Sequence, residues 1–177
     1  IEWAKDGSDG KLYILQARPE TVVSLQEHNL HDYQIKSKGK LLATGRSVGY
    51  GLGIGKAKII SNLEDMYLID EGDILVTDHT DPNWEPVMKK TAAIITDQGG
   101  RTCHAAIIAR ELGVPAVVGC LDATTNIQDQ STISVSCAEG DQGFVYEGSI
   151  EYELFTKKIE SLPKITTKIM LNIGNPD

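Results

Sequence analysis

The chain has 177 residues with a formal net charge of −8, and 41% of its residues are hydrophobic. This length supports one domain with a buried core together with flanking segments. The acidic balance argues against a general nucleic-acid or membrane-surface partner, and no apolar run approaches the ~20 residues that span a bilayer. The three cysteines include no C-x-x-C pair, which indicates neither a disulfide framework nor a zinc site and favours a cytoplasmic protein.

The N-terminal part predicts a hairpin followed by a connector. In residues 1–23, two strand-like runs flank a turn of Gly and Asp residues at 6–10, which is typical of a β-hairpin. Residues 24–40 are polar and end in a Lys-rich stretch, so they predict a linker. His28 and His31 could hold a metal ion if this stretch were helical, but its polarity favours a solvated linker.

Residues 41–148 predict a compact body that is rich in strands. One helix should begin after Asp81, an N-cap residue followed by Pro82 at the first helical position, and should end near residue 90. A second helix is expected at 103–112. Strands are expected at 57–60, 73–77, 92–96, 116–118, 132–136 and 143–146.

The C-terminal part predicts a second connector. Residues 149–167 are expected to form a linker that is helical from 151 to 160, and residues 168–177 should begin another strand. Because the chain starts at Ile1 and stops at Asp177 in the middle of a pattern, we expect it to be a piece of a longer protein.

The glycine-rich run at 49–57 does not fit the known phosphate-binding motifs. Tyr50 stands where a P-loop has its first Gly, and Ala57 replaces the Ser or Thr. Ile54 replaces the last Gly of a dinucleotide-binding fingerprint. These glycines therefore predict a bulge or a close backbone approach in a strand.

One histidine follows a Gly-Gly loop at the start of an apolar helix. A buried strand at 92–96 precedes Gly99 and Gly100, His104 falls in the first helical turn, and Gly113 supplies a helix stop. Free backbone N–H groups and the positive end of the helix dipole collect at such a position, so an anion bound to the imidazole is stabilised. His104 is therefore predicted to carry phosphate, on its outer ring nitrogen and at a partly exposed site. The alternative is a core or capping histidine beside a tight turn.

Neighbours of His104 suggest supporting roles. Arg101 can bind phosphate oxygens in a bidentate manner, and Thr102 can cap the helix and offer a hydroxyl. A Cys–His protease pair with Cys103 is disfavoured, because successive helical residues point about 100° apart. Cys103 is therefore interpreted as a small packing residue, and so are Cys120 and Cys137.

The motif Gly-Gly-x-Thr-x-His, followed by two small residues, two aliphatic residues, one small residue and Arg110, resembles the phosphohistidine signature of the phosphoenolpyruvate-utilising enzymes. The match runs on through residues 111–119. The resemblance implies an α/β fold at 41–148, a swivelling β/β/α phosphohistidine domain that is rich in strands and has two or three helices. It also implies that His104 is catalytic and that Gly100, Arg101 and Thr102 stabilise phosphate.

The flanks resemble other parts of the same enzymes. Residues 1–23 resemble the last hairpin of an ATP-grasp nucleotide-binding domain, which implies that Glu2, Gln16 and Arg18 line the ATP phosphate site. Glu2 would help to hold the Mg²⁺ that accompanies ATP. Residues 168–177 resemble the opening strand of the barrel that binds phosphoenolpyruvate and pyruvate.

Within the family, Arg101 and Cys103 resemble the branch that uses water as the second acceptor, because pyruvate, phosphate dikinases usually carry Met and Ser there. The resemblance then implies ATP and pyruvate as substrates, reached through adjacent domains, and is compatible with a homodimer of the full-length enzyme. Four alternatives stay open: a pyruvate, phosphate dikinase, a phosphotransferase-system enzyme, a binding module that only retains the fold, and a metal-binding structural domain.

Overall fold

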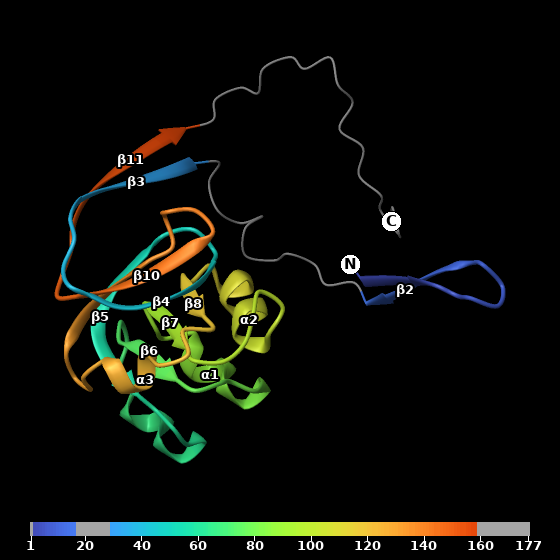
Figure 1. Ribbon diagram of the computed structural model, residues 1–177, viewed down its shortest axis with the longest axis horizontal. Helices are drawn as coiled ribbons and strands as arrows, with labels where there is room; N and C mark the ends of the chain where they lie inside the picture. Colours follow the sequence, from blue (N-terminus) through green and yellow to red (C-terminus); the bar gives the residue numbers. More distant parts are fainter. Residues whose placement is uncertain (1, 17–28, 159–177) are drawn as a thin grey trace.

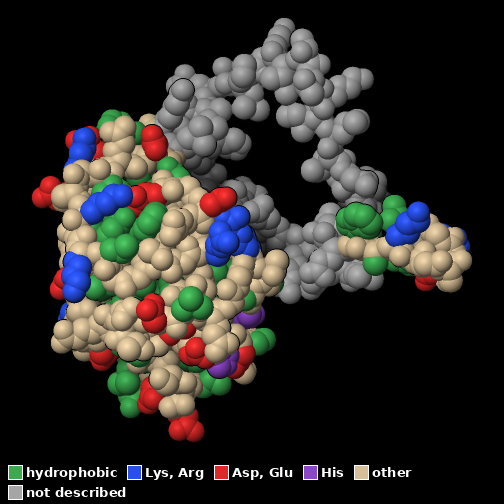
Figure 2. Space-filling view, viewed as in Figure 1, with side chains coloured by type: hydrophobic (Ala, Val, Ile, Leu, Met, Phe, Trp, Pro, Cys, Tyr) green, Lys and Arg blue, Asp and Glu red, His purple; other side chains and the backbone are tan. Residues whose placement is uncertain are grey.

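A computed structural model of the chain describes residues 2–16 and 29–158, which are drawn in colour in Figure 1 and Figure 2. The predicted strand at 168–177, Arg18, His28 and the first part of the predicted linker at 24–40 lie outside the described residues. None of the helices within the described ranges is long and apolar enough to cross a membrane.

The predicted N-terminal hairpin is confirmed. Strand β1 (Glu2–Lys5) pairs antiparallel with β2 (Leu12–Gln16). In the turn, the Asp6 carboxylate accepts hydrogen bonds from the backbone N–H groups of Ser8 and Asp9, at 2.6 and 3.2 Å. A short Asp side chain that binds the backbone two residues ahead favours this tight reversal.

A two-stranded ribbon is formed by β3 (Asn29–Ser37) and β11 (Glu151–Lys158). The helix expected at 151–160 is wrong, because 151–158 form β11. Within the predicted linker at 24–40, residues 29–37 form β3. An isolated helix of this length is marginal in water, whereas the aromatic and β-branched residues of β11 favour a strand once a partner is available. That partner is β3, with which β11 pairs antiparallel from one end to the other.

The body is a closed barrel of mixed strands. Around the barrel the neighbours follow the order β10-β4-β8-β7-β6-β5-β9, and β9 returns to β10. The pairs β5–β6, β6–β7 and β7–β8 are parallel and the remaining pairs are antiparallel. The strands are β4 (Leu41–Val48), β5 (Leu52–Ile59), β6 (Ile74–Thr77), β7 (Ala93–Thr96), β8 (Ala116–Val118), β9 (Thr132–Ser136) and β10 (Gln142–Glu147). All six predicted strands are present, and β4 is the one that was not predicted as a strand.

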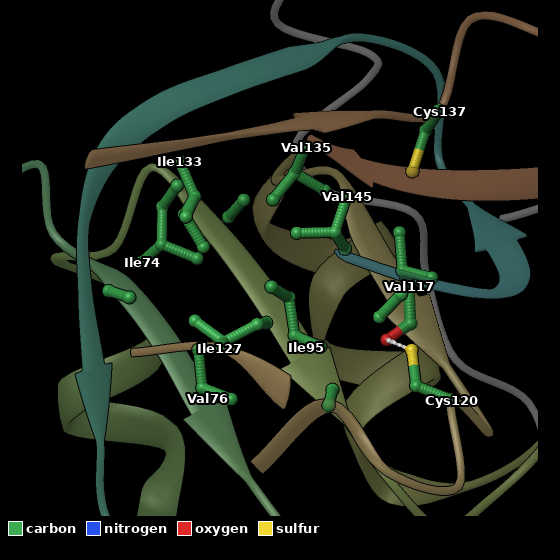
Figure 3. Close-up of a cluster of buried hydrophobic side chains, with 14 residues drawn as sticks. Ile74, Val76, Ile95, Val117, Cys120, Ile127, Ile133, Val135, Cys137 and Val145 are labelled. Atoms are coloured by element: carbon green, nitrogen blue, oxygen red, sulfur yellow. Dashed lines mark hydrogen bonds between the residues drawn. The ribbon is translucent and has the colours of Figure 1, made fainter. Parts of the chain in front are cut away.

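Strand alternation divides the buried side chains into two clusters. On β6, Ile74 and Val76 point into the barrel, whereas Leu75 points outward toward the helices. Strand β7 repeats this pattern with Ile95 inside and Ile94 outside. Figure 3 shows the inner cluster, where side chains from both the parallel and the antiparallel strands meet. Parallel strands that are buried on both faces require such continuous apolar runs.

Helices cover the outer face of the parallel strands. Their apolar side chains pack on the outward residues of β6, β7 and β8, and α1 and α2 lie on the same side of the barrel (Figure 1). The helix predicted from Asp81 is a 3₁₀ turn that continues into one α-helical turn, because Pro82 and Pro86 each restrict the backbone. The helical segments are η2 (Leu63–Leu68), η3 (Pro82–Trp84), α1 (Glu85–Met88), α2 (His104–Leu112) and α3 (Ala123–Asn126).

The glycine-rich run lies in β5 and permits close backbone approach. A Cβ atom on Gly53 would lie 2.4 Å from the carbonyl oxygen of Ala92, and one on Gly55 would lie 2.2 Å from that of Gly72. Real Cβ atoms do not approach carbonyl oxygens this closely, so a side chain at either position would push the strand away. The predicted close approach is confirmed.

An aromatic cluster joins the ribbon to the body. The ring of Tyr33 on β3 lies 5.8 Å from that of Tyr50, which sits in the turn between β4 and β5, and 5.8 Å from that of Tyr152 on β11. The Tyr50 hydroxyl also donates a hydrogen bond of 3.2 Å to Asp32. The ribbon therefore contacts the body through Tyr33 and Tyr50, and Tyr152 extends the aromatic cluster to β11.

Candidate functional site

His104 is the first residue of α2, and it stands where the loop from β7 meets the helix. Cys103 is the N-cap residue, with an extended backbone (φ −69°, ψ 164°) and no side-chain cap. The first-turn N–H groups have no acceptors within the helix, so they and the helix dipole favour an anion at this end. Gly113 ends the helix in the left-handed region. The predicted order of strand, glycine loop, histidine and helix is confirmed.

The imidazole of His104 is half-buried, as expected, but its outer nitrogen faces inward. The Nε2 atom is buried and has no hydrogen-bond partner among the described residues, and the same holds for the Thr80 hydroxyl. An unpaired buried polar atom costs about 1–3 kcal/mol, so this ring orientation leaves Nε2 without a hydrogen bond at an energetic cost. Nε2 would become accessible to another molecule only if the ring turned outward from this position.

A small hollow of about 200 Å³ lies beside the start of α2. Thr80, Cys103 and Ala105 contribute to its wall, so it reaches the residues on both sides of His104 in the sequence. His79 lies 3.0 Å from the Asp78 carboxylate through Nδ1, and the same carboxylate accepts a 2.8 Å hydrogen bond from the Gln98 amide. These contacts join the loops that follow β6 and β7.

Two glycines hold the histidine loop close to the barrel. Gly99 has a φ of +103° and Gly119 has a φ of +71°, which only glycine adopts without strain. A Cβ atom on Gly119 would lie 2.8 Å from the carbonyl oxygen of Gly99, and one on Gly99 would lie 2.8 Å from the Cys103 sulfur. Cys103 is thus a small residue packed against the loop, as predicted.

Asp97 anchors the same loop, and sequence reasoning missed it. Its buried carboxylate accepts hydrogen bonds from the backbone N–H groups of Ala123 (2.6 Å) and Thr124, and also from the Thr124 hydroxyl. The carboxylate therefore binds the N-terminus of α3 and ties it to the loop after β7. An Asp directly after a buried strand was the available signal, but its partners are 26 and 27 residues away.

Arg101 is paired rather than free. Its Nη2 donates a 2.7 Å hydrogen bond to the Asp141 carboxylate and a 3.2 Å hydrogen bond to the Asp141 carbonyl oxygen. Arg110 on α2 donates a 2.7 Å hydrogen bond to the Arg101 carbonyl oxygen. Gly100 is open, with nothing within 4 Å of a Cβ atom built on it.

The capping role predicted for Thr102 is wrong. The helix begins one residue later than expected, because Cys103 donates its backbone N–H to Gly100 and closes a turn before the helix. Thr102 is consequently exposed and forms no side-chain cap, while its hydroxyl stays next to His104 in sequence.

The surroundings of one carboxylate and two thiols shift their pKa values. The pKa of Glu85 is lowered, first by the hydrogen bond and charge of Lys89 and to a smaller extent by His104 across the α1–α2 contact. Burial raises the pKa of the Cys120 thiol to about 12 and also raises that of Cys137. Both thiols are therefore packing residues, as predicted.

The residues expected at the ATP site fall on the hairpin or outside the described residues. The backbones of Glu2 and Gln16 are partners across β1 and β2, so the two positions are adjacent. Arg18 lies outside the described residues.

Comparisons with known proteins cover the part of the chain that contains this site. Residues 69–140 match the family described as PEP-utilising enzyme, mobile domain. The matched residues form most of the body, so the body is similar to this mobile domain, and its barrel with outer helices is the β/β/α fold expected from that similarity.

More specifically, the chain is similar over its whole length to phosphoenolpyruvate synthases. It is 54% identical to that of Escherichia coli (strain K12) and 54% identical to that of Pseudomonas aeruginosa (strain UCBPP-PA14), and it spans 22% of the length of each. Among solved structures, it matches an Enzyme I protein with 33% identity and a TM-score of 0.38, over 47% of this chain and 33% of that one.

Proposed function

We propose that this chain is the phosphoryl-carrier segment of a phosphoenolpyruvate synthase. In the proposed reaction the His104 imidazole attacks ATP, AMP leaves, and a pyrophosphorylated histidine forms. Water then releases one phosphate, and the remaining phosphoryl group passes to pyruvate to give phosphoenolpyruvate. Dividing a difficult transfer into covalent steps is the usual role of such a nucleophile.

The position of His104 carries this proposal. The half-buried imidazole stands at the N-terminus of α2, where unpaired N–H groups and the dipole favour a dianionic phosphoryl group. Gly100 leaves the approach open, and Arg101 presents a guanidinium beside the loop. We assign Gly100, Arg101 and Thr102 to phosphate stabilisation, with Thr102 acting through its exposed hydroxyl rather than as a helix cap.

The flanking segments fit adjacent domains of the same enzyme. We assign 1–23 to the end of an ATP-grasp domain, 24–40 and 149–167 to connectors, 41–148 to the swivelling domain, and 168–177 to the start of the pyruvate-binding barrel. Within this proposal ATP and pyruvate are bound by those neighbouring domains. A homodimer of the full-length enzyme is compatible with it.

The hairpin supplies suitable groups for the nucleotide end. Glu2, Gln16 and Arg18 are assigned to the ATP phosphates, and the antiparallel pairing of β1 and β2 places the first two side by side. A carboxylate oxygen is a ligand that Mg²⁺ prefers, so Glu2 would help to hold the ion that accompanies ATP. That ion would offset the charge of the phosphates.

Substitution of the histidine tests the proposal. In the full-length synthase, His104→Asn should abolish both ATP cleavage and pyruvate phosphorylation, because the proposed covalent intermediate forms on this imidazole. His31→Asn, on the ribbon, is the matched control and should keep normal rates. Undiminished phosphoenolpyruvate formation by His104→Asn, in a protein whose melting temperature is unchanged, would refute the proposed function.

A further inference from the structure

We infer that Asp141 is a positioning residue for Arg101, fixing the guanidinium so that its free edge meets the phosphoryl group on His104. Asp141 has this role only if His104 carries phosphate, as proposed above. Asp141 stands immediately before β10, and 40 residues separate it from Arg101 in the sequence.

The backbone of Asp141 is itself fixed. Its carbonyl oxygen accepts a 3.1 Å hydrogen bond from the backbone N–H of Ser47 on β4. The next residue, Gln142, pairs with Arg46 in the β4–β10 ladder. The backbone of Asp141 is therefore held on the barrel, and the carboxylate extends from this fixed position toward Arg101.

Arg101 is held at both ends. Arg110 binds its carbonyl oxygen from α2, and Asp141 binds its Nη2 group from the barrel. A guanidinium has five N–H donors in a rigid plane. Nη2 uses its two on the carboxylate and the carbonyl oxygen of Asp141, while Nε and Nη1 have no acceptor in the described part of the chain. The donors that could bind an oxyanion are thus left free and oriented.

Asp141 also lies next to the wall that supports the histidine loop. It lines a hollow of about 550 Å³ together with Gly119, on which an added Cβ atom would lie 2.8 Å from the carbonyl oxygen of Gly99. The side chains of Arg101 and Asp141 are 44% and 88% exposed, so a group on a neighbouring domain can reach them. Donors held in place before the reaction need no reorganisation when charge develops, which is why orientation matters for phosphoryl transfer.

A double-mutant cycle tests this role. The rate of acid-labile phosphoenzyme formation from ATP is measured in single turnover for the full-length unchanged enzyme, Arg101→Ala, Asp141→Ala and the double variant. Arg101→Ala should slow the rate about 10²-fold. Asp141→Ala should slow it about three- to tenfold, since an exposed ion pair is a weak restraint. In the Arg101→Ala background, the Asp141 substitution should have no further effect.

Two further variants separate positioning from folding. Asp141→Asn keeps an oxygen that accepts from Nη2, so it should recover part of the rate. Glu153→Ala removes a carboxylate from another exposed ion pair, with Lys36 on the ribbon, and should leave the rate and melting temperature unchanged.

Three results would overturn the role of Asp141: an unchanged rate in Asp141→Ala, a faster rate, or equal slowing with and without Arg101. A faster rate would instead mean that the carboxylate competes with phosphate for the guanidinium. Absence of acid-labile label from the unchanged enzyme is a different result, because it would refute the proposed function and the role of Asp141 together.

Discussion

Gly119 is the position where one added methyl group should most directly disturb the histidine loop. In Gly119→Ala, the new side chain meets two penalties, a left-handed backbone (φ +71°) and a contact of 2.8 Å with the Gly99 carbonyl oxygen. The left-handed conformation costs an alanine roughly 1–2 kcal/mol, and the reduced entropy of the unfolded chain returns about 0.4–1 kcal/mol. Relieving the contact requires a backbone shift that costs about 1–3 kcal/mol. We expect a net loss of about 2–3 kcal/mol.

Gly72→Ala is the matched control for this loss. Gly72 also has a positive φ (+85°), but nothing lies within 4 Å of its added Cβ atom. Gly72→Ala should therefore lower the free energy of unfolding by only about 0–1 kcal/mol, which is the conformational penalty alone. Urea unfolding of both variants, followed by circular dichroism, gives the two free energies. Equal losses in the two variants would refute the close approach of Gly119 to Gly99 as the reason for glycine at 119.

Three further predictions concern other parts of the structure. Leu121 has a φ of +73° and is 86% exposed. Leu121→Gly should therefore raise the free energy of unfolding by about 0.5 kcal/mol in a urea titration. Leu121→Ala keeps the backbone strain and should leave the free energy of unfolding unchanged. Burial raises the Cys120 pKa from 9.0 to about 12, so the folded state favours the neutral thiol. The contribution of this thiol to the free energy of unfolding should therefore be fully present below pH 9 and should be lost as the pH rises toward 12. A Cys120→Ala variant whose stability changes with pH at the same slope would contradict this. Tyr50→Ala removes a ring contact and a hydrogen bond to the ribbon, so amide hydrogen exchange in β3 should become faster while the barrel strands stay protected. Tyr50→Phe, which removes only the hydrogen bond, should be intermediate. Equal exchange in all three proteins would mean that the aromatic cluster does not hold the ribbon.

Local signals in the sequence predicted the region around His104 well. The start and the end of α2 depend on nearby residues, namely the Gly-Gly loop before it and Gly113 after it. The strands β6, β7 and β8 were predicted because each is a short apolar run, and such runs are buried in the fold. Only the exact cap was wrong, since the turn closed by Cys103 and Gly100 moves the helix start by one residue.

Features that depend on partners distant in the sequence could not be predicted from local sequence patterns. Strand β11 was predicted as a helix because its partner β3 is more than a hundred residues away, and the pairing decides its conformation. The Arg101–Asp141 ion pair and the hydrogen bonds of Asp97 also join segments that are far apart in the sequence, and no periodic pattern of residues indicates that they meet. The inward orientation of the His104 Nε2 atom likewise follows from tertiary packing.

The proposed swivelling of the body also predicts a pattern of protease sensitivity. If the body moves as a unit, brief proteolysis of the chain should trim its ends and leave a fragment that contains 41–148 and unfolds cooperatively. Because β3 and β11 pair with each other outside the barrel sheet, the ribbon should be cleaved later than the ends but earlier than the barrel. Mass spectrometry of the fragments would identify the boundaries, and uniform resistance along the whole chain would contradict a separate body.

The most direct measurement follows the individual phosphates of ATP onto the histidine. The full-length synthase is incubated with ATP labelled with ³²P at either the β or the γ position, without pyruvate, and the acid-labile protein label is mapped by peptide. The proposed mechanism predicts that the β label stays on the peptide containing His104, is absent in His104→Asn, and passes to phosphoenolpyruvate when pyruvate is added, while the γ label is released as inorganic phosphate. A stable label on another residue, or no β label on His104, would contradict the assignment of this histidine as the phosphoryl carrier.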